Sequence, residues 1–301
     1  MKRALVVGSA GQDGTLLSDQ LQALGYEVGG VSKARGSIED PAAVAALVAG
    51  FQPDEIYYLA AFHHSSEDPA VEPGTLFDRS VAIHVSALVH FLEAMRAHAP
   101  RARLFYAASS LVFGDVTESP QTEATPILPT CAYGITKTTG LQICRHYRRA
   151  HAIHASVGIL YNHESPLRAA TFVSKKIVKA AWAITRGAQG KLVLGSLSAQ
   201  LDWGYAPDFV DAMRRILALD AADDFIIATG EPHSVGEFVE LAFGQLGLDW
   251  KRHVDENRGL ITRAPILRVG DPAKLTRATG WRPSTSFPAM VRALVDAEGA
   301  R

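Results

Sequence analysis

The stretch of sequence that decides the fold is Ala4-Leu5-Val6-Val7-Gly8-Ser9-Ala10-Gly11-Gln12-Asp13-Gly14. Its first four residues form a short apolar run that predicts a buried strand, and apolar residues recur at helical spacing from Thr15 to Leu24. The glycines in between are spaced GxxGxxG, at the point where the strand turns into the helix. Such a turn admits a pyrophosphate close to the backbone, at the N-terminus of the helix. We therefore predict that a dinucleotide binds to Gly8, Gly11, Gln12, Asp13 and Gly14.

Strand and helix patterns alternate along the chain as far as Leu160. Because parallel strands need a crossover connection, this alternation predicts a parallel sheet with helices on both faces. The fold class is therefore α/β, with a Rossmann-type doubly wound parallel sheet. The expected strands are 4–7, 27–31, 55–60, 104–108 and 155–160, and the expected helices are 15–24, 41–49, 81–97 and 133–151.

The alternation breaks after Asn162, at a polar segment that contains Pro166. We expect an NAD(P)-binding Rossmann domain made of residues 1–162 and 202–228. A smaller, discontinuous C-terminal lid that binds the substrate would be made of residues 163–201 and 229–301. The elements expected beyond Pro166 are helices at 172–185 and 207–219, a strand at 225–228, an apolar run at 266–269 and two or three amphipathic helices after 234.

The residues after the second expected strand bear on the choice of dinucleotide. Sites that prefer NAD usually place Asp or Glu there, whereas this chain has Ser32-Lys33-Ala34-Arg35. Two cations suit a 2′-phosphate, so NADP is favoured and NAD is the alternative. The cofactor-binding residues predicted in addition to the glycine turn are Ser32, Lys33, Arg35, Leu59, Ala60 and Ala61.

The composition excludes several classes of partner. The formal net charge is −1 and basic residues are spread along the chain, so we expect a small-molecule substrate, with no nucleic acid and no membrane as partner. Cys131 and Cys144 lack metal-ligand spacing, so neither a metal site nor a disulfide framework is predicted. No apolar run approaches the roughly 20 residues that span a bilayer. We expect a cytoplasmic protein.

The run Tyr133-Gly134-Ile135-Thr136-Lys137 carries the candidate catalytic pair. Tyrosine has a pKa of about 10 and is a poor base at neutral pH unless a nearby cation stabilises its phenolate. Residues i and i+4 share a helix face, so Lys137 can be that cation. Ser109, which follows the fourth expected strand, could hold a substrate hydroxyl against the phenolate. We predict that Tyr133, Lys137 and Ser109 form a redox acid/base site.

With the glycine turn, these residues resemble the extended short-chain dehydrogenase/reductase superfamily, of the NAD-dependent epimerase/dehydratase type. Within it, the chain is most similar to the GDP-mannose 4,6-dehydratases. Two matching segments are specific to that branch, namely His163-Glu164-Ser165-Pro166 and Ala228-Thr229-Gly230-Glu231. The matching stretches run nearly from end to end, at 11–14, 53–57, 133–134, 158–166, 172–177, 202–204 and 227–235.

The resemblance implies hydride transfer at carbon 4 of a nucleotide-linked hexose, with GDP as the expected nucleotide. Tyr133 would remove the proton of the 4-hydroxyl, while Lys137 would hold the cofactor ribose and lower the pKa of Tyr133. Apolar residues on several faces of the helices 81–97 and 133–151, as in relatives that pair through them, indicate a homodimer or higher homo-oligomer. The implied substrate-binding residues are Ser110, Asn162, Arg168, Phe172, Val173, Lys176 and Arg263.

Two positions depart from the family pattern. The dehydratases carry a Thr-x-Glu element whose carboxylate takes the proton from carbon 5, but this chain has Ser109-Ser110-Leu111, and leucine cannot act as a base. A general base typically contributes about 10² to 10⁴ in rate, so its loss disfavours the elimination of water. Leu201 stands where relatives place an arginine on the diphosphate. The candidates for a relocated base are His63, His64, His163 and Glu164.

Three hypotheses stay open from the sequence. The first is a 4-keto reductase or 4-epimerase for a GDP-mannose-type sugar, which needs hydride transfer alone. The second is a GDP-mannose 4,6-dehydratase whose base lies elsewhere. The third is a non-catalytic sensor that binds NADP or a nucleotide sugar, and the intact pair of Tyr133 and Lys137 speaks against it.

Overall fold

The computed structural model describes residues 1–32, 37–62, 71–260 and 267–300. Within them, a parallel sheet of six strands forms the centre of the larger part, in the order β2-β1-β3-β4-β5-β9. This arrangement confirms the predicted α/β fold with a doubly wound parallel sheet. The strands are β1 (Arg3–Val7), β2 (Glu27–Val31), β3 (Glu55–Tyr58), β4 (Arg103–Ser109), β5 (His154–Leu160) and β9 (Asp224–Ile227).

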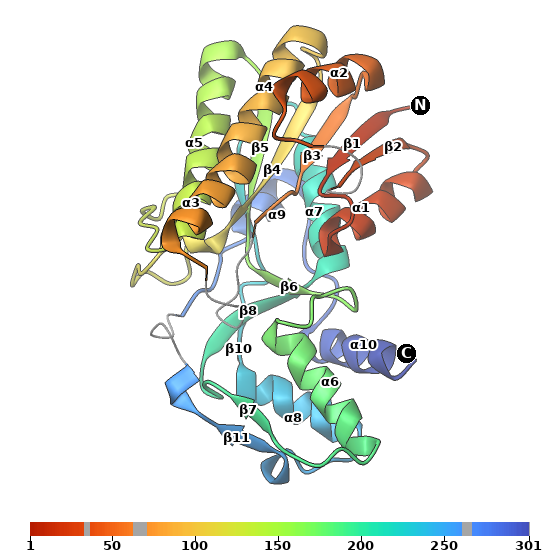
Figure 1. Cartoon of the computed structure of the whole chain (residues 1–301), viewed down its shortest axis with the longest axis vertical. Helices are drawn as coiled ribbons and strands as arrows, with labels where there is room; N and C mark the ends of the chain where they lie inside the picture. Colours follow the sequence, from red (N-terminus) through yellow and green to blue (C-terminus); the bar gives the residue numbers. More distant parts are fainter. Residues whose placement is uncertain (33–36, 63–70, 261–266, 301) are drawn as a thin grey trace.

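Helices cover both faces of this sheet (Figure 1). They are α1 (Gln12–Ala23), α2 (Pro41–Phe51), α4 (Ala87–His98), α5 (Ala132–His151) and α7 (Ala206–Leu217). Successive residues of a strand point to opposite faces, so in β1 Leu5 and Val7 pack into one hydrophobic cluster and Ala4 and Val6 into another. α2, α4 and α5 close the first cluster, and α1 and α7 close the second.

The helix expected at 81–97 begins earlier, at Pro73, and is interrupted by a π-helical turn. It starts as α3 (Pro73–Val81), with a proline in its first turn, and continues through η1 (Ala82–Ser86) into α4. η1 is π-helical, which inserts an extra residue into the helix. The sequence pattern missed α3 because much of it is exposed, including the large apolar side chains of Phe77 and Val81.

The smaller part of the molecule lies beyond the carboxyl ends of the central strands (Figure 1). Its helices enclose a third hydrophobic cluster, in which Trp203 packs against Phe238 and Phe287. The helices are α6 (Val173–Thr185), α8 (Val235–Gln245) and α10 (Phe287–Gly299). The strands are β6 (Asn162–Glu164), β8 (Gln200–Tyr205) and β10 (Pro232–Ser234) in one sheet, and β7 (Leu192–Leu194) and β11 (Val254–Glu256) in another.

The division into two domains stays a prediction. One segment that it assigns to the lid packs against the larger part instead. α9 (Ala273–Thr279) and Trp281 fall in the range assigned to the lid, yet Leu275 and Trp281 belong to the cluster that contains Phe209 of α7. In the described part of the apolar run 266–269, Arg268 forms an isolated bridge with Leu201, and these residues form no strand longer than that bridge. None of the helices in the described ranges has the length and apolarity that crossing a membrane requires.

Candidate active site

The glycine turn joins β1 to α1 as predicted, and two of its glycines are required by their surroundings. Gly8 has a φ of +94°, and a Cβ there would lie 2.8 Å from the backbone nitrogen of Ala60. A Cβ at Gly14 would lie 2.2 Å from the carbonyl oxygen of Gly8. A Cβ at Gly11 would meet the same oxygen at 3.4 Å, which is an ordinary contact, so a side chain could be accommodated here. Gly11 is the N-cap of α1 and brings no side chain to its first N–H groups, which fits an anionic pyrophosphate.

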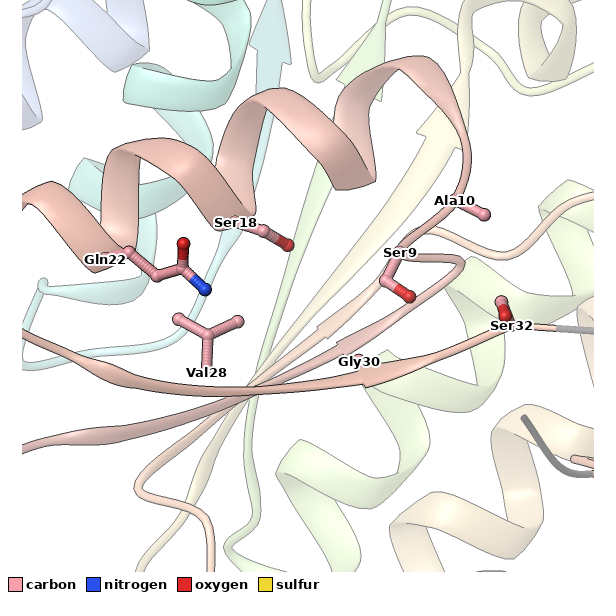
Figure 2. Close-up of a pocket in the computed structure, with 7 residues that line it drawn as sticks. All are labelled: Ser9, Ala10, Ser18, Gln22, Val28, Gly30 and Ser32. Carbon is pink, nitrogen blue, oxygen red and sulfur yellow. The ribbon is translucent and has the colours of Figure 1, made fainter. Parts of the chain in front are cut away.

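A pocket lies beside the turn, between α1 and β2 (Figure 2). Ser18 and Gln22 reach it from α1, while Ser9 and Ser32 line its other end. Its lining residues are Ser9, Ala10, Ser18, Gln22, Val28, Gly30 and Ser32. Lys33 and Arg35, which the sequence assigned to the 2′-phosphate of NADP, lie outside the described residues. Within the described part of the chain, Ser32 is the predicted selectivity residue that can be placed.

Tyr133 and Lys137 lie in the first turns of α5, on one face, as the i, i+4 spacing predicts. The thiol of Cys131 caps this helix by accepting the N–H of Gly134. The Lys137 ammonium donates a hydrogen bond to the carbonyl oxygen of Ala107, at 2.7 Å, and lies 5.7 Å from the centre of the Tyr133 ring. Burial lowers the pKa of Lys137 to about 7, against the opposing charge of Asp13.

Burial and nearby charges act on the pKa of the Tyr133 phenol in opposite directions. Burial raises the pKa of Tyr133, and the charge of Arg168 acts in the opposite direction. Lys137 lies close to the ring as well, and its role in lowering the pKa of Tyr133 stays a prediction.

Ser109 is the last residue of β4 and the N-cap of η2 (Ser110–Phe113), a 3₁₀ turn. This turn contains Leu111, the residue that departs from the Thr-x-Glu element of the dehydratases. The Ser109 hydroxyl accepts the N–H of Leu111 at 3.3 Å, and Ser110 is buried. A Cβ at Gly134 would lie 2.5 Å from the carbonyl oxygen of Leu111, so the first turn of α5 packs directly against this residue. The structure therefore places Leu111 beside the helix turn that carries Tyr133.

Asp13 of the glycine turn is paired with His163 of β6. The Nε2 atom of His163 lies 2.9 Å from Asp13 Oδ2, and its Nδ1 atom lies 2.7 Å from the carbonyl oxygen of Tyr161. Both ring nitrogens thus face oxygen acceptors, as they do in a protonated imidazolium. Burial opposes this charge, but Asp13 outweighs it and raises the pKa of His163. Gln12 adds a second tie, since it donates to the His163 carbonyl oxygen and accepts from Ser165.

The predicted substrate-binding residues follow β6 along the chain. Glu164 is buried, accepts a hydrogen bond from Ser174 at 2.6 Å and pairs with Arg168 at 3.2 Å. The Arg168 guanidinium also lies over the Phe172 ring, 3.6 Å from its centre. Arg263, His63 and His64 lie outside the described residues. Among the remaining members, Asn162 opens β6, and Val173 and Lys176 lie in the first two turns of α6. Leu201, which departs from the family pattern, lies in β8.

His84 is a site residue that the sequence pattern missed. It lies in the π-helical turn η1, is fully buried, and its ring meets the Tyr133 ring edge to face at 5.1 Å. A histidine inside the apolar run Ala82-Ile83-His84-Val85 was the available signal. The contact itself could not be predicted, because it depends on the π turn and on the approach of α5.

A family model described as GDP-mannose 4,6 dehydratase matches residues 31–294 of this chain. GDP-mannose 4,6 dehydratase 1 of Arabidopsis thaliana is 35% identical, over 98% of this chain and 89% of the relative. GDP-mannose 4,6-dehydratase of Sinorhizobium fredii is 36% identical, over 95% of this chain and 93% of the relative. The similarity therefore extends over both parts of the molecule.

Solved structures share the fold at lower identity. RMD from Pseudomonas aeruginosa, complexed with NADPH, matches with a TM-score of 0.87 and 22% identity, over the whole of both chains. The dTDP-glucose 4,6-dehydratase of Bacillus anthracis, in complex with NAD, matches with a TM-score of 0.86 and 18% identity, over 100% of this chain and 97% of that one. The solved structures confirm the fold, and the family match and the relatives confirm the enzyme class. On these matches, the chain belongs to the GDP-mannose 4,6-dehydratase family.

Proposed function

We propose that this chain transfers hydride between NADP and carbon 4 of a GDP-linked hexose, as a 4-keto reductase or a 4-epimerase. Support for the sugar comes from the family, whose named members act on GDP-mannose. Support for the reaction comes from the chemistry around Tyr133. NAD is the alternative cofactor.

The residues of the glycine turn would hold the cofactor's pyrophosphate, with Gly8 and Gly14 shaping the turn and Gly11 leaving space above it. A bound nicotinamide dinucleotide supplies the hydride acceptor or donor. In the direction of reduction, Tyr133 would give its proton to the 4-keto oxygen while carbon 4 gains the hydride, and a hydroxyl results. Lys137 would supply the neighbouring cation, and its pKa of about 7 suits proton exchange at neutral pH.

Leu111 is the observation that carries the choice of reductase or epimerase. Its carbonyl oxygen faces the first turn of α5, at Gly134, so this position adjoins the helix turn that carries Tyr133. The resemblance puts the carboxylate of the dehydratases at this position, and an aliphatic side chain cannot take a proton from carbon 5. Hydride transfer at carbon 4 needs no second base.

The relocated-base candidates within the described residues are both held in ion pairs. His163 directs both ring nitrogens at oxygen atoms, of Tyr161 and Asp13, and has no lone pair for a substrate proton. Glu164 is buried between Ser174 and Arg168. His63 and His64 belong to the ranges that the structure does not describe. These pairings support the reductase or epimerase over the dehydratase.

The test is a set of incubations followed by mass spectrometry. We expect NADPH consumption with a GDP-linked 4-keto-6-deoxy sugar for a reductase, or altered stereochemistry at unchanged mass for an epimerase. Loss of one water from GDP-mannose in the presence of NADP would instead establish the dehydratase, which the names of the relatives favour. Binding of NADPH and GDP-mannose without turnover of any of these sugars would establish the sensor. Y133F is the control, and it should abolish turnover while still binding NADPH.

The proposal includes a homodimer in the cytoplasm. Phe77 and Val81 of α3 and Ile135 of α5 are large apolar side chains that are exposed, on two helices that lie against each other. An apolar surface of this kind fits a second copy of the chain. The free thiols of Cys131 and Cys144 fit a reducing compartment. Light scattering of the purified protein tests the oligomeric state.

A further inference from the structure

His84 occupies the π-helical turn η1 between α3 and α4, close to the centre of the candidate site. Turns of this type often mark functional sites, because the extra residue redirects a side chain. The Tyr58 hydroxyl donates to the carbonyl oxygen of Ile83, at 2.5 Å, which fixes the turn. α5 packs closely against it, since a Cβ at Gly140 would lie 2.9 Å from the His84 carbonyl oxygen.

The hydrogen bonds of the His84 ring define its tautomer. The backbone N–H of Phe62 donates to Nε2 at 2.9 Å, so Nε2 carries no proton. Nδ1 is therefore protonated and donates to the Thr136 hydroxyl at 2.8 Å. That hydroxyl donates in turn to the carbonyl oxygens of Ala132, at 2.9 Å, or Tyr133, at 3.1 Å. The direction of donation is consistent from Phe62 to the first turn of α5, with a neutral imidazole at its centre.

This chain of hydrogen bonds connects the first turn of α5 with the segment that follows β3. On one side, His84 contacts the catalytic helix twice, through Thr136 and through the edge-to-face packing on the Tyr133 ring, at an interplanar angle of 84°. On the other side, Phe62 directly follows the segment 59–61, which the sequence assigns to the cofactor. Within that segment, Ala60 lies against Gly8 of the glycine turn.

We propose that His84 is a positioning residue with two separable roles. Its Nδ1–H fixes the first turn of α5 and so the orientation of Tyr133, and its Nε2 fixes the segment after β3 and so the affinity for the cofactor. The catalytic half of this inference rests on the proposed function. The cofactor half rests on the dinucleotide site alone.

Two amide substitutions separate the roles. Asn places its amide nitrogen near the position of Nδ1, so H84N keeps the bond to Thr136 and loses the bond to Phe62. Gln places its amide oxygen near the position of Nε2, so H84Q keeps Phe62 and loses Thr136. We expect H84N to raise the Kd for NADPH about tenfold and to lower kcat less than H84Q does, since both variants lose the ring contact with Tyr133 but H84N keeps the bond to Thr136. We expect H84Q to lower kcat by about tenfold or more with the Kd for NADPH nearly unchanged.

A second pair of variants checks the route through Thr136. T136V removes the hydroxyl at nearly constant volume and should lower kcat as H84Q does. T136S keeps the hydroxyl and should retain the kcat of the wild type. The double variant H84Q/T136V should be no slower than H84Q, because both remove the same link.

Hydrogen exchange by mass spectrometry gives a readout that needs no substrate. H84Q should speed exchange in the first turn of α5, and H84N should speed it in the segment 59–62. If both variants change kcat, Kd and exchange alike, or lower only the melting temperature, His84 has no separable positioning role. If no sugar is turned over by the wild type, the proposed function fails, while the NADPH and exchange results still decide the cofactor half.

Discussion

The Nε2 atom of His163 lies 2.9 Å from the carboxylate of Asp13, although the two residues are 150 positions apart in the sequence. Asp13 stands in the first turn of α1, and His163 stands in β6, where the chain leaves the central sheet for the smaller part. The imidazole also stacks on Phe209 of α7, with ring centres 4.6 Å apart. The pair therefore ties the dinucleotide turn to the segment that is expected to bind the sugar nucleotide.

The pair makes stability depend on pH in a definite window. The pKa of Asp13 is lowered from 3.8, because His163 outweighs the burial that would raise it, so its contribution is present above pH 3.8 and is lost as the pH falls through its folded pKa. The pKa of His163 is raised from 6.5, so its contribution is full below pH 6.5 and is lost as the pH rises through its folded pKa. Both contributions are present between about pH 3.8 and 6.5.

We predict that D13N destabilises the protein by on the order of 3 kcal/mol within that window, and by less at pH 8. Urea unfolding of D13N and the wild type at pH 5 and at pH 8 measures the difference. D19N is the matched control, because Asp19 is an exposed carboxylate on the same helix. Equal losses at the two pH values would show that His163 is not charged in the folded protein.

Burial of Lys137 predicts a pH dependence of stability opposite to that of His163. Its pKa falls from 10.5 to about 7 on folding, so between these values the folded protein binds fewer protons than the unfolded chain. The contribution of Lys137 to stability therefore becomes less favourable as the pH falls from 10.5 to 7.

K137M removes this titration while keeping a buried chain of similar length. We expect the melting temperature of K137M, relative to the wild type, to rise as the pH is lowered from 10 to 7, while turnover falls by about 10² or more. Thermal unfolding across that pH range, with kcat at pH 7, provides the measurement. A difference in melting temperature that does not vary with pH would mean that Lys137 stays charged when buried.

The sequence predicted the elements whose pattern is local. The parallel strands, the glycine turn and the placement of Tyr133 and Lys137 on α5 all follow from periodicity and spacing over a few residues. The short strands such as β6 and β7 were missed, since three residues carry no periodic signal. The Asp13–His163 pair and the tautomer of His84 depend on contacts between distant segments, which no local pattern encodes.

Leu111 gives a gain-of-function test of the proposed reaction. L111E places a carboxylate at the position where the family keeps its base, in a half-buried side chain next to Ser109 and α5. We expect L111E to release water from GDP-mannose in the presence of NADP, and L111Q, which has the same shape without a base, not to do so. Mass spectrometry of the product detects the reaction. Dehydration by the wild type at the rate of L111E would mean that another group already serves as the base.

Two glycines of the turn have different roles: Gly14 is required by the packing of the turn, and Gly11 is expected to be required for binding the cofactor. At Gly14 a Cβ would lie 2.2 Å from the carbonyl oxygen of Gly8, a backbone atom that can move only if the turn moves. At Gly11 the same oxygen is 3.4 Å away, which is ordinary contact, and the φ of −78° suits alanine. Alanine at Gly11 therefore fits the folded chain but fills the space that a pyrophosphate would use.

We predict that G14A lowers the melting temperature markedly, whereas G11A leaves it within a few degrees of the wild type and raises the Kd for NADPH by about tenfold or more. Thermal unfolding in the absence of nucleotide, together with titration of NADPH fluorescence, distinguishes the two effects. G50A is the control, because a Cβ there meets nothing within 4 Å. Tight NADPH binding by a fully folded G11A would place the pyrophosphate elsewhere and remove the structural basis for the cofactor site at this turn.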